Sequence, residues 1–146
     1  MISNRVGMLV CVAVIVMVLA AVAVPAAEQR DGVFIHLSSG ADQPQRVLMA
    51  LKMAVIMSED HDVLIYFDIK GIEVVLKDAP EITSKSFLTS RKQLAVLKKR
   101  GVTMMACPGC LEAAGKKPAD LSEGIEVANK EAFFNFTRGR ILSLDY

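Results

Sequence analysis

Short apolar runs alternate with segments of helical periodicity along residues 28–146. Residues 33–37 and 63–67 are almost wholly apolar and rich in β-branched side chains, which is typical of strands buried on both faces. Residues 102–106 and 140–144 form two further runs of this kind. Strands separated by helical segments at these intervals predict βαβ units. We therefore expect a three-layer α/β/α domain with a mainly parallel sheet.

The helical segments between these runs carry recognisable start and stop signals. Asp42 with Gln45 and Ser90 with Gln93 resemble N-caps followed three residues later by an amide side chain. Apolar residues at helical spacing follow each of these pairs. The remaining segments are expected to be helices over residues 110–114 and 130–134, a short capped segment starting at Asp120, and an ambiguous helix or loop over residues 71–76.

The first 27 residues differ from the rest of the chain. Arg5 precedes an uncharged apolar run, residues 6–24, which leads to small residues and then a polar segment, as in a secretory signal. The run approaches the roughly 20 residues that span a bilayer. We therefore expect residues 1–27 to be a signal peptide or an N-terminal membrane anchor. Residues 28–146 would then form one domain that is periplasmic or secreted, or held at the inner membrane only through residues 6–24 if these stay attached.

Composition narrows the classes of function. The chain has 146 residues, with 17 Lys and Arg against 16 Asp and Glu, and a formal charge of +1. This balance excludes a strongly basic nucleic-acid binder, so we expect no nucleic-acid partner. Trp is absent and aromatic residues make up 5% of the chain, which argues against a stacking platform for single strands.

Cys107 and Cys110 form a Cys-X-X-Cys motif directly after a predicted strand and at the start of a predicted helix. Ligands and chemistry collect at the carboxyl ends of strands in open α/β sheets. A thiol at a helix N-terminus is favoured as the thiolate, which is the nucleophilic form. The spacing also lets the second thiol attack a mixed disulfide or persulfide on the first. We expect Cys107 and Cys110 to be the catalytic pair.

Two other interpretations of the motif stay open. An oxidising compartment favours a structural disulfide, in which case the chain would be a non-catalytic oligomeric binding module. So short a loop, however, recovers little loop-closure entropy. A periplasmic metal-binding protein is the other alternative, with copper recruiting Met104, Met105 or His36 beside the cysteines. A structural zinc usually needs a second pair of ligands, which residues 28–146 lack, so we expect neither metal nor cofactor at the site.

His36 is the third candidate catalytic residue. It lies near the end of the first predicted strand, on the same sheet edge as Cys107 if both strands are parallel. An imidazole there could polarise the thiolate or accept its proton. The alternative is a hydrogen-bonded core histidine. His61, between two aspartates, is expected in an exposed turn, and the stripe of Met49, Met53 and Met57 in the core or at an oligomer interface.

Several segments together resemble the DsrE/DsrF-like family, which includes TusD-type sulfur-relay subunits and is sometimes labelled peroxiredoxin-like. The residues that carry the resemblance are 34–40 (FIHLSSG), 62–67 (DVLIYF), 101–107 (GVTMMAC), 111–115, 121–125 and 141–146. The resemblance implies a three-layer α/β domain, a homo-oligomer and a strand-end cysteine that carries a persulfide. Cys107 matches that cysteine, whereas Cys110 is not general in the family.

The resemblance also implies the kind of partner. A sulfur donor or acceptor protein, or a small sulfane-sulfur compound, is expected to react with Cys107. The expected activity is that of a sulfurtransferase or sulfur carrier, although family membership does not by itself establish an enzyme. The apolar leader departs from relay proteins that work in the cytoplasm, so their cytoplasmic partners do not transfer to this chain.

Overall fold

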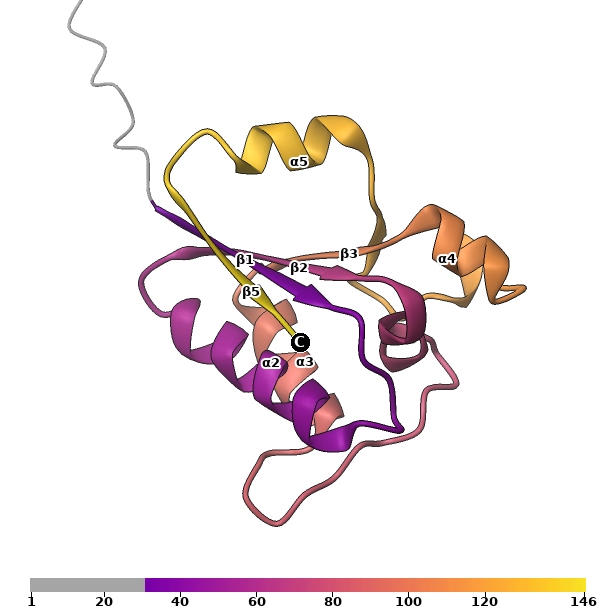
Figure 1. Ribbon diagram of the computed structural model, residues 1–146. Helices are drawn as coiled ribbons and strands as arrows, with labels where there is room; N and C mark the ends of the chain where they lie inside the picture. The colour runs from indigo at the N-terminus through magenta and orange to yellow at the C-terminus, as the bar shows by residue number, and fades with distance from the viewer. Residues whose placement is uncertain (1–30) are drawn as a thin grey trace, which may run out of the picture.

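The computed structural model describes residues 31–146, so the signal peptide or anchor predicted for residues 1–27 lies outside the described residues. Within this part of the chain five strands form one sheet in the order β4-β3-β2-β1-β5, and all four pairings are parallel (Figure 1). The strands are β1 (Gly32–Leu37), β2 (Asp62–Phe67), β3 (Thr103–Ala106), β4 (Glu126–Val127) and β5 (Ile141–Asp145).

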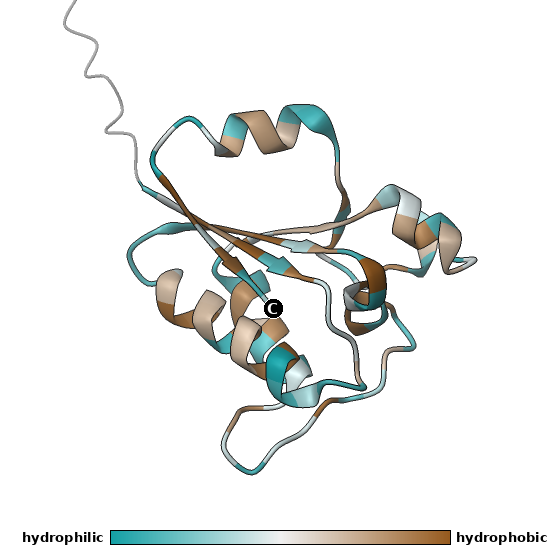
Figure 2. Cartoon of the chain, viewed as in Figure 1, coloured by the Kyte–Doolittle hydropathy of each residue, from teal (hydrophilic) through white to brown (hydrophobic). Residues whose placement is uncertain are grey.

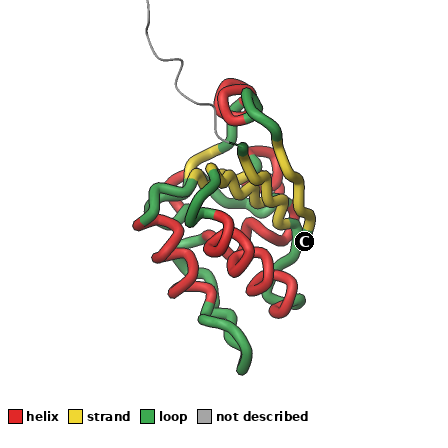
Figure 3. The backbone as a smooth tube through the Cα atoms, turned by 90° about the vertical axis from the view of Figure 1, so that its left-hand side faces the viewer, coloured by secondary structure: helices red, strands yellow, loops and turns green. Residues whose placement is uncertain are grey.

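Helices cover both faces of this sheet. Helices α2 (Pro44–Met57) and α3 (Ser90–Lys99) lie side by side on one face, and α5 (Lys130–Phe136) lies on the other (Figures 1 and 3). Helix α4 (Pro108–Ala113) follows the carboxyl end of β3. Two 3₁₀ helices complete the elements, η1 (Ile69–Val75) and η2 (Pro118–Asp120). The predicted α/β/α architecture is confirmed.

Strand alternation divides the apolar side chains between the two faces. Ile35, Ile65 and Phe67 are fully buried between the sheet and the α2 and α3 helices, in the main core. Leu64 and Met105 point to the α5 side, where they form a smaller cluster. Apolar residues accordingly concentrate in the strands, while the loops and the outer helix surfaces are more polar (Figure 2). Among residues 31–146 no helix combines the length and the apolar character required to cross a membrane.

The predicted cap of the first helix is wrong. Gln43, not Asp42, is the N-cap residue of α2, and its side chain makes no capping hydrogen bond. The Asp42 carboxylate instead pairs with the Lys70 ammonium group at 2.6 Å. This ion pair connects the start of α2 to η1, so a long-range partner replaces the local capping contact.

The capping pair predicted for the second helix is also wrong. The N-cap of α3 is Thr89, whose hydroxyl accepts a hydrogen bond from the Lys92 N–H. Ser90 and Gln93 are both buried. The Ser90 hydroxyl accepts from the Ile82 N–H at 3.0 Å, and the Gln93 amide donates to two backbone carbonyls. These side chains satisfy the polar backbone of neighbouring segments rather than the helix end.

The region after α4 differs most from expectation. The segment predicted to start at Asp120 does not form, because Asp120 is the last residue of η2 and its carboxylate accepts from the Lys117 N–H at 2.7 Å. The chain then enters β4, a strand of two residues that the pattern did not predict. The ambiguous segment at 71–76 is largely the 3₁₀ helix η1.

Candidate functional site

The carboxyl ends of three adjacent strands meet at one edge of the sheet. His36 in β1 is in register with Tyr66 in β2, and Tyr66 is in register with Met105 in β3. Asp68 directly follows β2, and Cys107 directly follows β3. The structure therefore brings His36 and Cys107 to the same edge, as the parallel arrangement predicts.

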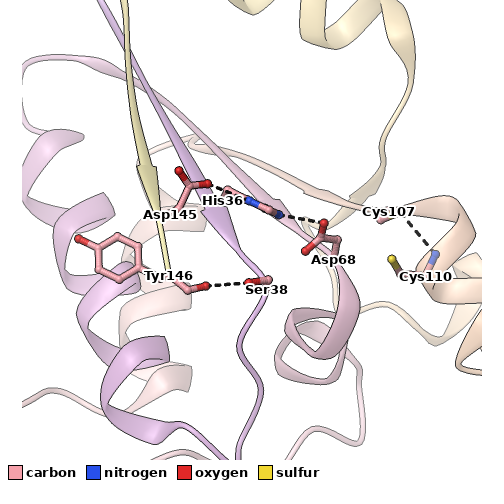
Figure 4. A network of polar contacts seen from close by, with 7 residues as sticks. All are labelled: His36, Ser38, Asp68, Cys107, Cys110, Asp145 and Tyr146. Atoms are coloured by element: carbon pink, nitrogen blue, oxygen red, sulfur yellow. Dashed lines mark hydrogen bonds and ion pairs between the residues drawn. The ribbon is translucent and has the colours of Figure 1, made fainter.

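Cys107 makes the transition from strand to helix. Its backbone N–H donates to the Phe67 carbonyl at 2.8 Å, which continues the β2–β3 pairing by one residue. Cys107 is also the N-cap of α4, and its Sγ accepts from the Cys110 N–H at 3.4 Å (Figure 4). Pro108 suits the first helical position because its missing N–H needs no partner there. The motif thus fixes the Cys107 sulfur against the first turn of the helix.

The Cys107 thiol is shifted toward its anionic form. Burial by itself raises the pKa of Cys107. Hydrogen bonds from the Tyr66 side chain, from the backbone N–H groups of Cys110 and Gly109, and from the Cys110 thiol outweigh burial, and they lower the pKa below its ordinary value. A lowered pKa means more thiolate, the nucleophilic form of cysteine.

Cys110 is shifted in the opposite direction. A hydrogen bond from the Ile69 backbone lowers the pKa of Cys110. The Cys107 thiol, burial and the negative charge of Asp68 act in the opposite direction and together have the larger effect. The net result is a raised pKa. Both cysteines are free thiols and both are partly exposed. The pair therefore combines a sulfur that favours the thiolate with one that keeps its proton.

Ile69 holds an unusual backbone conformation beside this pair. Its φ is 45°, in the left-handed region that β-branched residues rarely adopt. Backbone outliers of this kind cluster at functional sites, where the surrounding structure enforces them. Here the conformation accompanies the hydrogen bond from the Ile69 backbone to Cys110. The Ile69 side chain itself is 65% exposed, so packing of that side chain does not explain the strain.

His36 lies between two carboxylates. Its Nδ1 is 2.9 Å from Asp145 Oδ1, at the end of β5, and its Nε2 is 2.8 Å from Asp68 Oδ2 (Figure 4). Burial lowers the pKa of His36, but the hydrogen bonds and charges of the two aspartates raise it above its ordinary value. An imidazolium can donate to both carboxylates at once, whereas a neutral imidazole can donate to only one.

The second oxygen of Asp68 is a further feature of this cluster. Oδ1 is buried, and none of residues 31–146 gives it a hydrogen-bond partner. The negative charge of Asp68 raises the pKa of both Tyr66 and Cys110, so this carboxylate acts on the thiol side of the edge as well as on His36. A buried acceptor without a partner is costly unless a ligand or water satisfies it. Asp68 Oδ1 is therefore an acceptor at this edge that a ligand or a water molecule could satisfy.

Tyr66, Asp68 and Asp145 are site residues that the sequence analysis missed. Each lies at or next to the carboxyl end of a parallel strand, as His36 and Cys107 do. Applying the strand-end rule to every polar side chain, rather than to cysteine and histidine alone, would have selected them. Tyr66 was hidden inside an apolar run, where an aromatic side chain is expected to belong to the core.

Other candidates take structural positions. His61 is exposed and hydrogen-bonds to Asp60, as expected of a turn residue. Met53 and Met57 pack partly against the main core, whereas Met49 is exposed. In the part of the chain that the structure describes, no group of three or more His, Cys, Asp or Glu residues is arranged to hold a metal ion.

This fold and site define a parallel α/β domain that carries a dithiol at the carboxyl edge of its sheet. The model of the DsrE/DsrF-like family matches residues 31–138, which is more than half of the chain. The chain belongs to the DsrE/DsrF-like family. Membership suggests a function of the sulfur-relay type and protein partners of that kind in general.

Solved structures share the fold at low sequence identity. The YchN protein from E. coli superimposes with a TM-score of 0.63 at 14% identity, covering 80% of this chain and 100% of its own. MTH1491 from Methanobacterium thermoautotrophicum, a protein of unknown function, gives a TM-score of 0.55 at 17% identity, with the same coverage of both chains. The comparison with curated proteins gave no match.

Proposed function

We propose that the protein carries sulfane sulfur on Cys107 and passes it to an acceptor. The observation that supports this proposal best is the opposite shift of the two thiols, with the pKa of Cys107 lowered and that of Cys110 raised. A persulfide carrier needs a sulfur that attacks as a thiolate, and a neighbouring thiol that keeps its proton does not compete with it. Family membership supports the same type of chemistry.

The loading step is a displacement at sulfur. The Cys107 thiolate attacks the outer sulfur of a donor persulfide, R–S–SH, and a new S–S bond forms as the donor's S–S bond breaks. The electron pair leaves with the donor as R–S⁻, and Cys107 becomes Cys107–S–SH. An acceptor thiolate then attacks the same outer sulfur and regenerates the Cys107 thiolate. Neither transfer changes the total number of electrons on the sulfur atoms.

Cys110 provides a second exit for the sulfur. Its sulfur attacks Cys107 Sγ in the loaded protein, so that a Cys107–Cys110 disulfide forms and the outer sulfur leaves as H₂S with the Cys110 proton. The sulfane sulfur is reduced in this step and the two thiols are oxidised. A dithiol reductant then restores both thiols. The raised pKa of Cys110 slows this step, which gives an acceptor time to take the sulfur.

His36 acts in this proposal by positioning. Both of its ring nitrogens face carboxylates, so we assign it the task of fixing Asp68 rather than taking the proton of Cys107. A lowered pKa at Cys107 makes a separate base unnecessary.

The proposal also includes export, by a signal peptide or anchor in residues 1–27, and a homo-oligomer as the working form.

The test is the intact mass of the full chain, expressed with its leader and purified without reductant. The mass is measured before and after exposure to inorganic polysulfide and again after mild reductant. The expected result is a gain of one or more sulfur atoms that reductant reverses, that Cys107→Ser abolishes and that Cys110→Ser prolongs. Peptide mapping assigns the added sulfur to Cys107.

Two outcomes would contradict the proposal. Equal loading of the Cys107→Ser protein removes the carrier mechanism. A resting protein whose Cys107 and Cys110 are already joined, and stay joined in mild reductant, favours a structural disulfide. The same spectra show whether residues 1–27 remain attached in the exported protein, and light scattering on the purified sample measures the oligomer.

A further inference from the structure

Tyr66 contacts the thiol site from the neighbouring strand. It lies in β2 in register with Met105, two residues before Cys107, and its side chain is partly buried on the α5 face of the sheet. The register places Tyr66 diagonally across from Cys107, within reach of its aromatic side chain, and hydrogen bonding from Tyr66 lowers the pKa of Cys107. Because Cys107 N–H is itself bonded to the Phe67 carbonyl, β2 fixes both the backbone and the sulfur of Cys107.

Three ring contacts fix the orientation of the Tyr66 side chain. Its centroid is 5.1 Å from that of Phe133 with the planes at 78°, and 5.9 Å from that of His36 with the planes at 28°. Phe34 stacks on it at 6.3 Å. Aromatic pairs at such distances stabilise one another. The hydroxyl is therefore held in place before any substrate arrives, which is what a positioned donor requires.

The Tyr66 hydroxyl also keeps its proton. Burial, the hydrogen bond to Cys107 and the negative charges of Cys107, Asp68 and Cys110 all raise the pKa of Tyr66. At the pH where Cys107 is a thiolate, Tyr66 is consequently a neutral O–H donor. A neutral donor stabilises a neighbouring anion without competing for its role as nucleophile.

We infer that Tyr66 is a positioning residue that holds the Cys107 sulfur as an anion, together with the Cys110 N–H on the other side. The inference rests on the proposed function for its biological meaning, since it names the group that prepares the carrier sulfur. It assigns to a tyrosine on the adjacent strand a role that we had expected of the helix turn and His36 alone. No bond to Tyr66 forms or breaks, and its proton stays on the hydroxyl.

The experiment compares the only two tyrosines of the chain. Tyr66→Phe keeps the ring and its stacking but removes the hydroxyl, and Tyr146→Phe makes the same change where the ring is turned away from the His36 and Asp68 side chains (Figure 4). In the sulfur-free full chain, alkylation of Cys107 by iodoacetamide is followed against pH by peptide mass spectrometry. Because Asp68, Cys110 and His36 also face the site, each curve is recorded in the Cys110→Ser background as well.

The expected result is an upward shift of the Cys107 midpoint by about one pH unit in Tyr66→Phe, or about tenfold less thiolate at any pH well below both midpoints. Tyr146→Phe is expected to leave the midpoint unchanged. An unshifted midpoint in Tyr66→Phe, or the same shift in both variants, overturns the inference. Because this experiment loads no sulfur, failure of the carrier proposal would not change the measured midpoint. An unshifted midpoint would likewise leave the sulfur-loading test unaffected.

A second measurement covers the case in which Tyr66→Phe does not fold. Replacing the tyrosines by 3-fluorotyrosine keeps the ring and the hydroxyl but makes the phenol a stronger donor. The Cys107 midpoint is then expected to move downward in the wild-type chain and by the same amount in Tyr146→Phe, where Tyr66 is the one tyrosine left to carry fluorine. An unchanged midpoint in the fluorinated wild-type chain counts against the inference.

Discussion

The imidazole of His36 stacks on the ring of Tyr66, with centroids 5.9 Å apart and planes inclined by 28°. This contact joins two groups of side chains with opposite effects on the protonation of a neighbouring residue. On one side the two aspartates hold a proton on His36, and on the other Tyr66 favours loss of a proton from Cys107. A change in the charge of His36 or its two aspartates therefore acts on Tyr66, the side chain next to the reactive sulfur.

The stability of the protein is expected to fall as pH rises through the His36 titration. Its pKa is raised in the folded state, so the full stabilisation is present below about pH 6.5, where the unfolded chain also carries the proton. Above that pH the unfolded histidine loses its proton first, and the stabilisation is lost as the pH passes the folded pKa. The side chain is 31% exposed, so the effect is expected to stay under about 1 kcal/mol.

The measurement is urea unfolding at closely spaced pH values in wild type, His36→Gln and His61→Gln. The decline is expected in wild type and in His61→Gln, because His61 lies outside the cluster. It should be weakened in His36→Gln. A decline of the same size in all three proteins would show that other groups control it.

Gly71→Ala is expected to destabilise the protein and to disturb the site. A Cβ at Gly71 would lie 2.0 Å from the Leu37 carbonyl oxygen, which is closer than any real contact, so η1 has to move away from β1. The expected loss of unfolding free energy is about 1–3 kcal/mol. Because the Gly71 N–H donates to the Asp68 carbonyl, the movement displaces Asp68 from His36 as well.

Gly109→Ala is the matched control for this substitution. Among the described residues nothing lies within 4 Å of a Cβ at Gly109, and the residue is inside α4. We expect this variant to unfold within about 1 kcal/mol of wild type, with any change toward greater stability. Chemical denaturation of the two variants side by side tests the pair, and equal losses would contradict the role of the close approach at Gly71.

Ile69→Gly is expected to be more stable than Ile69→Ala by about 1 kcal/mol. Both substitutions remove the same exposed side chain, and only glycine suits a φ of 45°. Thermal unfolding of the two variants gives the difference directly. If alanine proved equal to glycine, the backbone at this position would have to relax without strain.

Cys107 is expected to react before Cys110 in the reduced, folded protein. The two thiols are both partly exposed, so their different pKa values decide the order of reaction at neutral pH. With less than one equivalent of iodoacetamide, Cys107 should carry several times more label than Cys110. In denaturant the labelling should become equal, and equal labelling of the folded protein would contradict the opposite shifts.

The apolar pattern was sufficient to predict most of the sheet. β1, β2 and β3 are runs of largely buried residues, and their spacing implies parallel pairing. β5 is apolar in sequence but lies at the edge of the sheet with none of its residues buried, so the expectation of burial on both faces is wrong for this strand. β4 was not predicted because a strand of two residues is too short to show an apolar pattern. It forms by pairing with Met105 and Ala106 at the edge of β3. The wrong caps at Asp42 and Ser90 have a common cause, since each side chain is bonded to a different segment, Asp42 to Lys70 and Ser90 to the Ile82 N–H.

The sequence predicted only those site residues whose type is itself characteristic of a reaction. Two cysteines with a short spacing indicate thiol chemistry in any context, and the predicted strand end located them. Nothing in the sequence around Asp68 and Asp145 distinguishes them from other acidic residues. Their role depends on the strand register, which places both carboxylates next to His36. Tyr66 acquires its role through its neighbours in three dimensions, which no local pattern of the sequence contains.

The pairing of β1 with β5 is expected to come last when the edge is assembled during folding. His36 and Asp145 are 109 residues apart in the chain, whereas β2 and β3 are joined by a shorter connection. Contacts of long sequence separation form slowly, because a large loop has to close first. The thiol pair can therefore reach its place against β2 while His36 still lacks its second carboxylate. A chain at that stage would hold the Cys-X-X-Cys turn without the full set of charges around it. Reactivity of the thiol pair that develops before the contact between His36 and Asp145 would therefore confirm this order.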